Sequence, residues 1–229
     1  YADGFRKQSQ IVPTAVTAQA SFDAVSPKLG VLWEPATEIQ FFANHSKSDE
    51  FPTFVELAQI AAFVPVREQT AWTTELGTRG TLGWVSWDVA VYRANIKREM
   101  LQFTVGPDIP AATFNADKTR HQGVEAAFSA MPTNWLRFRQ IWQYSDFRFV
   151  GDVQYGNRRL PVVPIHVLRS ELRLGDDDLH ISPNVEWVPQ GAWADYRNTT
   201  RNGGYTLWGV SAAARIKNGV NIFVDARNL

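Results

Sequence analysis

The stretch Val220-Asn221-Ile222-Phe223-Val224-Asp225-Ala226-Arg227 alternates small apolar residues with mostly polar or charged ones, Phe223 being the exception. Because successive side chains of a β-strand point to opposite faces, one face of this strand would carry Val, Ile and Ala. The other face would carry a carboxylate and a guanidinium. The same period of two recurs along most of the chain, whereas helical periodicity is almost absent. The sequence therefore predicts an all-β protein.

Short turns and long connections alternate along the chain. Turn-forming residues cluster at 34–37, 79–82, 131–134, 175–178 and 217–219, and longer connections lie near 49–69, 99–118, 149–163 and 190–203. This pattern predicts about ten antiparallel strands in a single domain over residues 1–229. They form hairpins near 28–34 and 38–48, 70–79 and 83–97, 119–130 and 135–147, 164–174 and 179–189, and 204–216 and 220–229.

The two faces of these strands favour a transmembrane β-barrel over a soluble β-sandwich, the alternative with the same alternation. Segments such as 83–97 and 135–147 exceed the usual soluble strand, and all short turns fall at one end of the sheet, as in outer-membrane barrels. An Arg or Lys that faces lipid near the bilayer centre costs about 2–4 kcal/mol. We therefore expect these charged residues to face a wet interior: Glu75, Arg79, Glu125, Arg137, Arg139, Arg169, Glu171, Arg173, Glu186, Asp225 and Arg227.

Composition and motifs narrow the function. The formal net charge is zero, which gives no reason to expect a nucleic-acid partner. The chain has no cysteine, and its four histidines are scattered without metal-ligand spacing, so no metal site is expected. No nucleophile elbow, zinc signature or phosphate loop appears, and we expect neither an enzyme nor a bound cofactor.

Several phrases, in the same order and at similar spacing, resemble the C-terminal half of TonB-dependent outer-membrane receptors. They are SPKLGVLWEP (26–35), FPTFVELA (51–58), TAWTTELGTRG (70–80), FNADKTRHQGVEAAF (114–128), NRRLPVVPIHVLRSELRL (157–174) and VNIFVDARNL (220–229). The resemblance implies a barrel of about 22 strands around a plug. Residues 1–229 would then supply about ten of these strands, without the plug, the TonB-contacting segment or the closing strand.

The resemblance also implies a function, namely TonB-powered uptake of a ferric siderophore or similar scarce ligand across the bacterial outer membrane. The barrel would be monomeric and would contact TonB, outer-membrane lipid and lipopolysaccharide, with its interior charges bonded to the plug. The same family also transports copper, haem, cobalamin and carbohydrate, and a passive porin is a further alternative. Ligand contacts are expected from the long loops, unless these residues pack the loops or contact lipopolysaccharide: Phe51, Phe54, Tyr155, Arg158, Arg159, Trp193, Tyr196 and Arg197.

Overall fold

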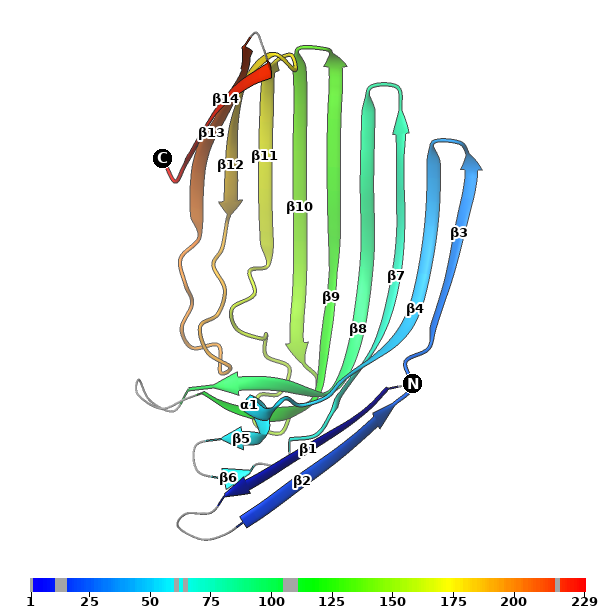
Figure 1. The fold of residues 1–229 in the computed structure, drawn as a ribbon, viewed down its shortest axis with the longest axis vertical. Coiled ribbons are helices and arrows are strands. Elements are labelled where there is room, and N and C mark those ends of the chain that lie inside the picture. The colour runs from blue at the N-terminus through cyan, green and yellow to red at the C-terminus, as the bar shows by residue number, and fades with distance from the viewer. Residues whose placement is uncertain (1, 11–15, 60–61, 64–65, 105–110, 217–218) are drawn as a thin grey trace.

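The computed structural model describes residues 2–10, 16–59, 62–63, 66–104, 111–216 and 219–229. In these residues, ten strands form one antiparallel sheet in which neighbours in sequence are neighbours in space (Figure 1). All five predicted hairpins are present. The strands are β3 (Lys28–Ala36), β4 (Ile39–Glu50), β7 (Gln69–Leu82), β8 (Val85–Phe103), β9 (Ala112–Thr133), β10 (Leu136–Phe149), β11 (His166–Gly175), β12 (Leu179–Val188), β13 (Tyr205–Ile216) and β14 (Val220–Arg227).

The two ends of this sheet differ. Short turns join the hairpins at one end, which we call the turn end, and long connections gather at the other, the loop end (Figure 1). The smaller elements lie at the loop end: β1 (Ala2–Gln10), β2 (Val16–Ala24), α1 (Phe54–Leu57), β5 (Ala58–Gln59) and β6 (Ala62–Phe63). Among the described residues, no helix is long and apolar enough to cross a membrane.

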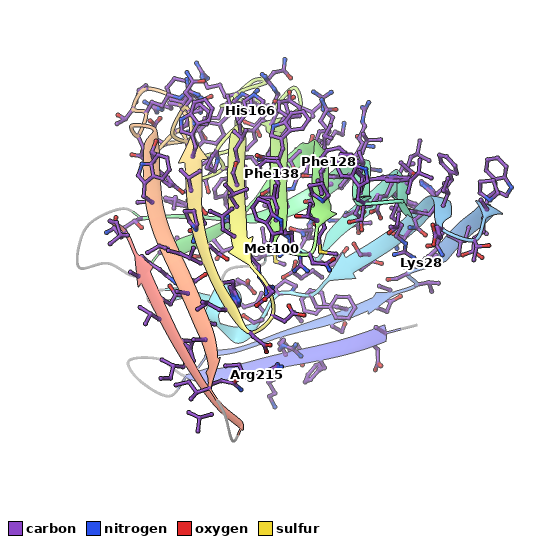
Figure 2. The ribbon with its side chains drawn as sticks, turned by 90° about the horizontal axis from the view of Figure 1, so that it is seen from above. Lys28, Met100, Phe128, Phe138, His166 and Arg215 are labelled. Carbon is purple, nitrogen blue, oxygen red and sulfur yellow. The ribbon has the colours of Figure 1, made fainter. Side chains whose placement is uncertain are left out.

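The sheet curves into an open trough with Phe128, Phe138 and His166 on its outer, convex side (Figure 2). Register partners share a face, so the pairing Val91–Val124–Tyr144 across β8, β9 and β10 extends the convex apolar surface. No second sheet covers these rows in the described part of the chain, and large apolar side chains remain exposed there. Examples are Val31, Trp33, Leu76, Val91, Phe128, Phe138, Leu172, Ile181, Trp187, Trp208, Ile222 and Val224. A soluble sandwich would bury these rows against each other, so that alternative is wrong.

Some predicted boundaries are also wrong. The turn expected at 79–82 belongs to β7, and the chain instead reverses at Gly83, whose φ of 59° favours glycine. Much of the connection expected at 99–118 is strand, because β8 runs to Phe103 and β9 begins at Ala112, with the pairing continuing to that point. Residues 105–110 lie outside the described residues.

Buried apolar clusters lie at the loop end rather than within the trough. One cluster consists of Phe22, Leu57 and Val66, and the other of Ala116, Phe149 and Leu160. The first cluster joins β2 to the connection between β4 and β7, and the second joins the loop ends of β9 and β10 to the connection between β10 and β11. The loops are therefore held by a conventional apolar interior, whereas the strands expose one apolar face along their length.

Phe42, which breaks the alternation by lying on the concave face, fills a gap left by a glycine. Its ring covers Gly77 so closely that a Cβ at Gly77 would overlap it. The Arg79 guanidinium lies 5.9 Å from the centre of the same ring. Glycine thus permits the aromatic ring to lie against β7 on the concave face.

Candidate ligand-binding loops and charged interior

Two long connections, 150–165 and 189–204, form an open depression of about 580 Å³ at the loop end. Four residues expected to bind ligand line it together: Tyr155, Arg158, Arg159 and Trp193. The first three lie in one predicted connection and Trp193 in another, and the sequence alone does not show that the two connections meet. Guanidinium groups beside an aromatic ring can pair with anionic groups and stack on planar ones.

Asn198 joins the two connections. Its side-chain oxygen accepts a hydrogen bond from the Arg159 backbone N–H at 2.9 Å, and its amide nitrogen donates to the Arg159 carbonyl oxygen at 2.9 Å. The backbone N–H of Val162 donates to the Trp193 carbonyl oxygen at 2.8 Å. These paired bonds give the depression a defined shape.

Asp195 organises the second connection internally. Its carboxylate accepts hydrogen bonds from the backbone N–H groups of Thr200 at 2.7 Å and Thr199 at 3.0 Å. The hydrogen bond from Thr200, followed by those from Thr199, holds the pKa of Asp195 below its usual value of 3.8. The carboxylate therefore stays ionised and keeps this turn closed at neutral pH.

Tyr155 and Tyr196 belong to an aromatic cluster beneath the depression. The Tyr155 ring stacks on Phe149 with centroids 4.8 Å apart, and the Tyr196 ring meets Phe114 edge-on at 5.6 Å. The Tyr196 hydroxyl donates to the Gln102 carbonyl oxygen at 2.6 Å. Burial raises the pKa of Tyr196 to about 12, so the hydroxyl is a neutral donor at physiological pH.

The other residues expected to bind ligand occupy separate places. Phe51 stacks on Phe22 with centroids 5.6 Å apart, Phe54 is the first residue of α1, and Arg197 is exposed. Arg159 also reaches the convex face, where its guanidinium lies 2.9 Å from the Asp146 carboxylate. Whether any of these residues binds a ligand stays a prediction.

All eleven charged residues expected to face the interior lie on the concave face, because strand register places them opposite to Phe128 and Phe138. Some of them pair with each other. Arg169 Nε donates to the Glu186 carboxylate at 2.6 Å, and the Tyr205 hydroxyl donates to its other oxygen at 2.8 Å. Arg227 binds the Asp225 carboxylate through two nitrogens, each at 2.9 Å.

Other concave charges have no such partner. Within the described part of the chain, Glu75, Glu125, Glu171 and Arg139 form no ion pair. Glu75 and Glu125 line a hollow of about 720 Å³ together with Asp88 and Arg79. These groups are free to hydrogen-bond whatever occupies the trough.

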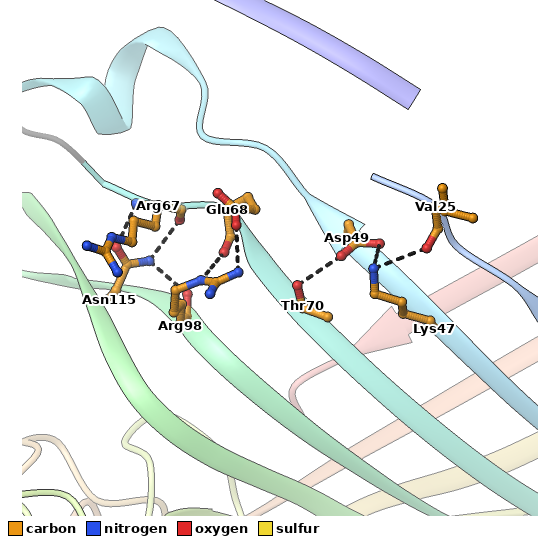
Figure 3. A network of polar contacts seen from close by, with 8 residues as sticks. All are labelled: Val25, Lys47, Asp49, Arg67, Glu68, Thr70, Arg98 and Asn115. Carbon is orange, nitrogen blue, oxygen red and sulfur yellow. Dashed lines mark hydrogen bonds and ion pairs between the residues drawn. The ribbon is translucent and has the colours of Figure 1, made fainter. Parts of the chain in front are cut away.

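A polar network fastens the connection between β4 and β7 to the β8–β9 hairpin (Figure 3). The Asn115 side chain accepts from the Arg67 backbone N–H at 2.8 Å and donates to the carbonyl oxygens of Arg67 at 2.9 Å and Arg98 at 2.8 Å. Arg98, which has a φ of 56°, forms an ion pair with Glu68 at 2.6 Å. One asparagine thereby orders three backbone segments.

A second group in the same view ties β4 to its neighbours (Figure 3). The Asp49 carboxylate accepts from the Thr70 hydroxyl at 2.8 Å and lies 3.0 Å from Lys47 Nζ. Lys47 also donates to the Val25 carbonyl oxygen at 3.1 Å. The segment between β2 and β3 is thus anchored to β4, which is tied in turn to β7.

Sequence reasoning missed Asp146, Asn115 and Asn198, which hold the loop end together. Each lies in a segment where polar residues are common, and each has at least one partner that is distant in sequence, such as Arg159 for Asp146 and for Asn198 and Arg67 for Asn115. Among the described residues, no group of three or more His, Asp or Glu side chains could hold a metal ion.

Comparison with known proteins agrees with this architecture. The family described as "TonB dependent receptor-like, beta-barrel" matches residues 1–229. A search of curated protein sequences gave no significant match.

Among solved structures, the chain is similar to the ferric yersiniabactin uptake receptor FyuA from Yersinia pestis, with a TM-score of 0.76 and 20% identity over 95% of this chain and 34% of that one. It is similar to the copper transporter OprC, with a TM-score of 0.78 and 15% identity over 95% of this chain and 35% of that one. It is also similar to the siderophore receptor PiuA from Acinetobacter baumannii, with a TM-score of 0.75 and 14% identity over 97% of this chain and 34% of that one.

The chain therefore spans about a third of the length of each of these structures, and at such identities they show a shared fold. The match over the whole chain, the single curved sheet and the division into an apolar convex and a charged concave face point to one family. The chain belongs to the TonB-dependent receptors and forms part of their β-barrel domain.

Proposed function

We propose that the chain is part of a receptor that takes up a ferric siderophore, or a similar scarce ligand, across the bacterial outer membrane with energy supplied through TonB. TonB-dependent receptors are transporters of the outer membrane and not enzymes. The observation that carries the proposal is the charged concave face within a barrel whose convex face is apolar. An open passive pore would leave the unpaired carboxylates and guanidiniums of its wall without protein partners. A domain that fills the barrel would supply hydrogen-bond partners for them.

In this proposal the trough holds a plug domain contributed by another part of the complete protein. The unpaired Glu75, Glu125, Glu171 and Arg139 hydrogen-bond polar groups of the plug. Such bonds break at modest cost when TonB pulls, because the wet interface can replace them with water. The paired residues Arg169 and Glu186 stiffen the wall instead.

The loop end faces the outside of the cell, and the turn end faces the periplasm. Arg158, Trp193 and Arg197 are the loop residues with side chains best placed to reach a ligand, since Arg158 and Arg197 are exposed and Trp193 lines the depression. Tyr155 and Tyr196 support them from the aromatic cluster below. An anionic ferric chelate fits such a surface through charge-assisted hydrogen bonds and stacking.

The test uses the complete gene product in a bacterial strain that lacks its own copy. We expect uptake of radiolabelled ferric siderophore that stops when tonB is deleted. The Arg158→Ala receptor should bind about tenfold more weakly, as expected for loss of a hydrogen bond to a charged group. Val153→Ala, in the same connection but fully exposed, is the matched control and should change nothing.

A second candidate is copper uptake, favoured by the structural likeness to the copper transporter OprC. The same strains supplied with radiolabelled copper distinguish the two cargoes. Uptake that persists without TonB would instead favour a passive porin and contradict the proposal.

A further inference from the structure

On the convex face, three neighbouring strands change from apolar to basic side chains along one register line. Val91, Val124 and Tyr144 are register partners in β8, β9 and β10 and belong to the apolar surface. Beyond this line, towards the loop end, the same face carries six cations. We name them the basic band: Arg93, Lys97, Lys118, Arg120, Arg148 and Arg159.

Strand register sets these cations directly against one another. Lys97 pairs with Lys118, Arg120 with Arg148, and Arg148 with Arg159. Like charges directly opposite on a sheet destabilise it. Three such pairs in one patch are costly unless anions lie between them.

The chain itself supplies little compensation. Asp146 is buried within the band, and its carboxylate lies 2.6 Å from Arg148, 2.9 Å from Arg159 and 4.0 Å from Arg120. One carboxylate is thus shared by three guanidiniums, and it fixes their positions more than it neutralises them.

In the part of the chain that the structure describes, several donors of the band have no acceptor, although Arg93 Nε donates a long hydrogen bond to the Asn95 side-chain oxygen at 3.4 Å. Within the described residues, Arg93, Lys97 and Lys118 form no ion pair and are exposed. Arg120 Nε is buried and has no hydrogen-bond partner in this part of the chain. The band therefore presents unused donors outward, on the side where the apolar rows end.

The position of the band decides the chemistry of its ligand. The ligand must place anionic oxygens directly beside hydrocarbon, which a soluble chelate at the concave face does not do. We propose that the basic band binds the phosphate groups of a phosphorylated lipid headgroup in the outer leaflet. Arginine pairs with phosphate through two parallel hydrogen bonds, and lysine adds a mobile point charge. This inference rests on the proposed membrane location but not on which cargo is transported.

The test measures lipid binding by the complete receptor purified in a neutral detergent, separately from any uptake assay. The probes are bisphosphorylated lipid A, the same lipid with both phosphates removed, and inorganic phosphate. The variant is Lys97→Gln/Lys118→Gln, which removes one like-charged pair. The matched control, Lys28→Gln/Arg67→Gln, removes two exposed cations outside the band. Bound lipid is counted by native mass spectrometry, and the thermal midpoint is followed by tryptophan fluorescence.

We expect the wild-type receptor and the control variant to bind the bisphosphorylated lipid with an affinity that falls as salt rises. A basic residue near an anionic surface contributes about fivefold, so the double variant should bind about 25-fold more weakly. Without lipid, its thermal midpoint should equal or exceed that of wild type, because a repulsive pair is gone. Weaker lipid binding together with an equal or higher thermal midpoint excludes a merely structural effect of the double substitution.

Equal lipid binding by the double variant and wild type would overturn the proposal, and so would equal binding of the dephosphorylated lipid. Stabilisation by inorganic phosphate as large as that by the lipid would assign a simple anion site and also overturn it. Lipid binding that is lost in the double variant supports the band even if siderophore uptake is never observed, so the two proposals fail separately.

Discussion

An arginine placed at residue 212 of β13 should destabilise the complete receptor far more than one placed at residue 213. The parent residues are both alanine, and both lie in the same strand. Ala212 shares the convex face with its register partners Ile181 and Val224, whereas Ala213 shares the concave face with His180 and Phe223. The two arginine substitutions are thus matched in strand propensity and in side-chain size. They differ only in whether the new side chain faces lipid or water.

The free-energy cost of arginine at residue 212 follows from the depth of this residue in the membrane. Ala212 is the middle residue of the convex row that runs from Trp208 to Ile216. It lies about 13 Å along the strand from Trp208, or about 10 Å along the membrane normal at a tilt of about 40°, within an apolar band about 25 Å tall. An Arg near the midplane costs about 2–4 kcal/mol. On the wet concave face the cost should stay within about 0.5 kcal/mol. The expected difference of about 1.5–4 kcal/mol corresponds to roughly 10- to 700-fold in the folding equilibrium.

The assay is guanidinium unfolding of the receptor refolded into lipid vesicles, read by tryptophan fluorescence. Ala212→Leu controls for volume and should be nearly neutral. Ala214→Arg, on the same face but nearer the turn end, should cost less than Ala212→Arg, because the penalty falls towards the interface. Equal destabilisation by Arg at 212 and 213, or a larger cost at 213, would refute the assignment of the two faces.

Three further outcomes test the wall and the loops. Gly123→Ala should cost about 1–3 kcal/mol in the same unfolding assay, because the added Cβ would overlap the Tyr144 carbonyl oxygen of the paired strand. An unchanged midpoint would contradict the close approach of β9 and β10. Tyr196 should ionise near pH 12 rather than 10, seen as a late ultraviolet transition that is absent from Tyr196→Phe. Because its folded pKa is raised, its contribution to loop stability should be complete below pH 10 and lost as pH rises through about 12. Asn115→Ala removes three hydrogen bonds and should cost about 1–3 kcal/mol. Limited proteolysis should then cut the 51–68 connection faster, and an unchanged cleavage rate would argue against the network.

The sheet was predictable because the decisive signal is local. A period of two assigns each side chain to a face, and turn-forming residues divide the chain into hairpins, so strand order follows when neighbours in sequence pair. The sequence motifs that resemble those of TonB-dependent receptors then indicated the class of barrel. Even the exceptions have simple causes, since Gln140 and Ser170 both break the apolar row and are register partners, with the Ser170 hydroxyl donating to Gln140 at 2.6 Å.

The loop end was less predictable. Most of the connection expected at 99–118 is paired strand, because residues 99–103 pair with residues 112–116 across the hairpin. Tyr155 and Tyr196 are predicted to contact ligand from their residue type and their place in the long loops; the structure packs them with Phe114 and Phe149, and their contact with a ligand stays a prediction. Residue type alone cannot separate an aromatic that binds a ligand from one that supports a loop.

The amino-acid sequence by itself determined the all-β architecture, the hairpins and the separation of apolar from charged faces, because alternation acts between adjacent residues. Only the tertiary structure decided that Lys97 faces Lys118 and that Arg148 lies between Arg120 and Arg159. Such groupings depend on strand register and on loops folding back over distant strands, and neither is encoded in the spacing of residues along one strand.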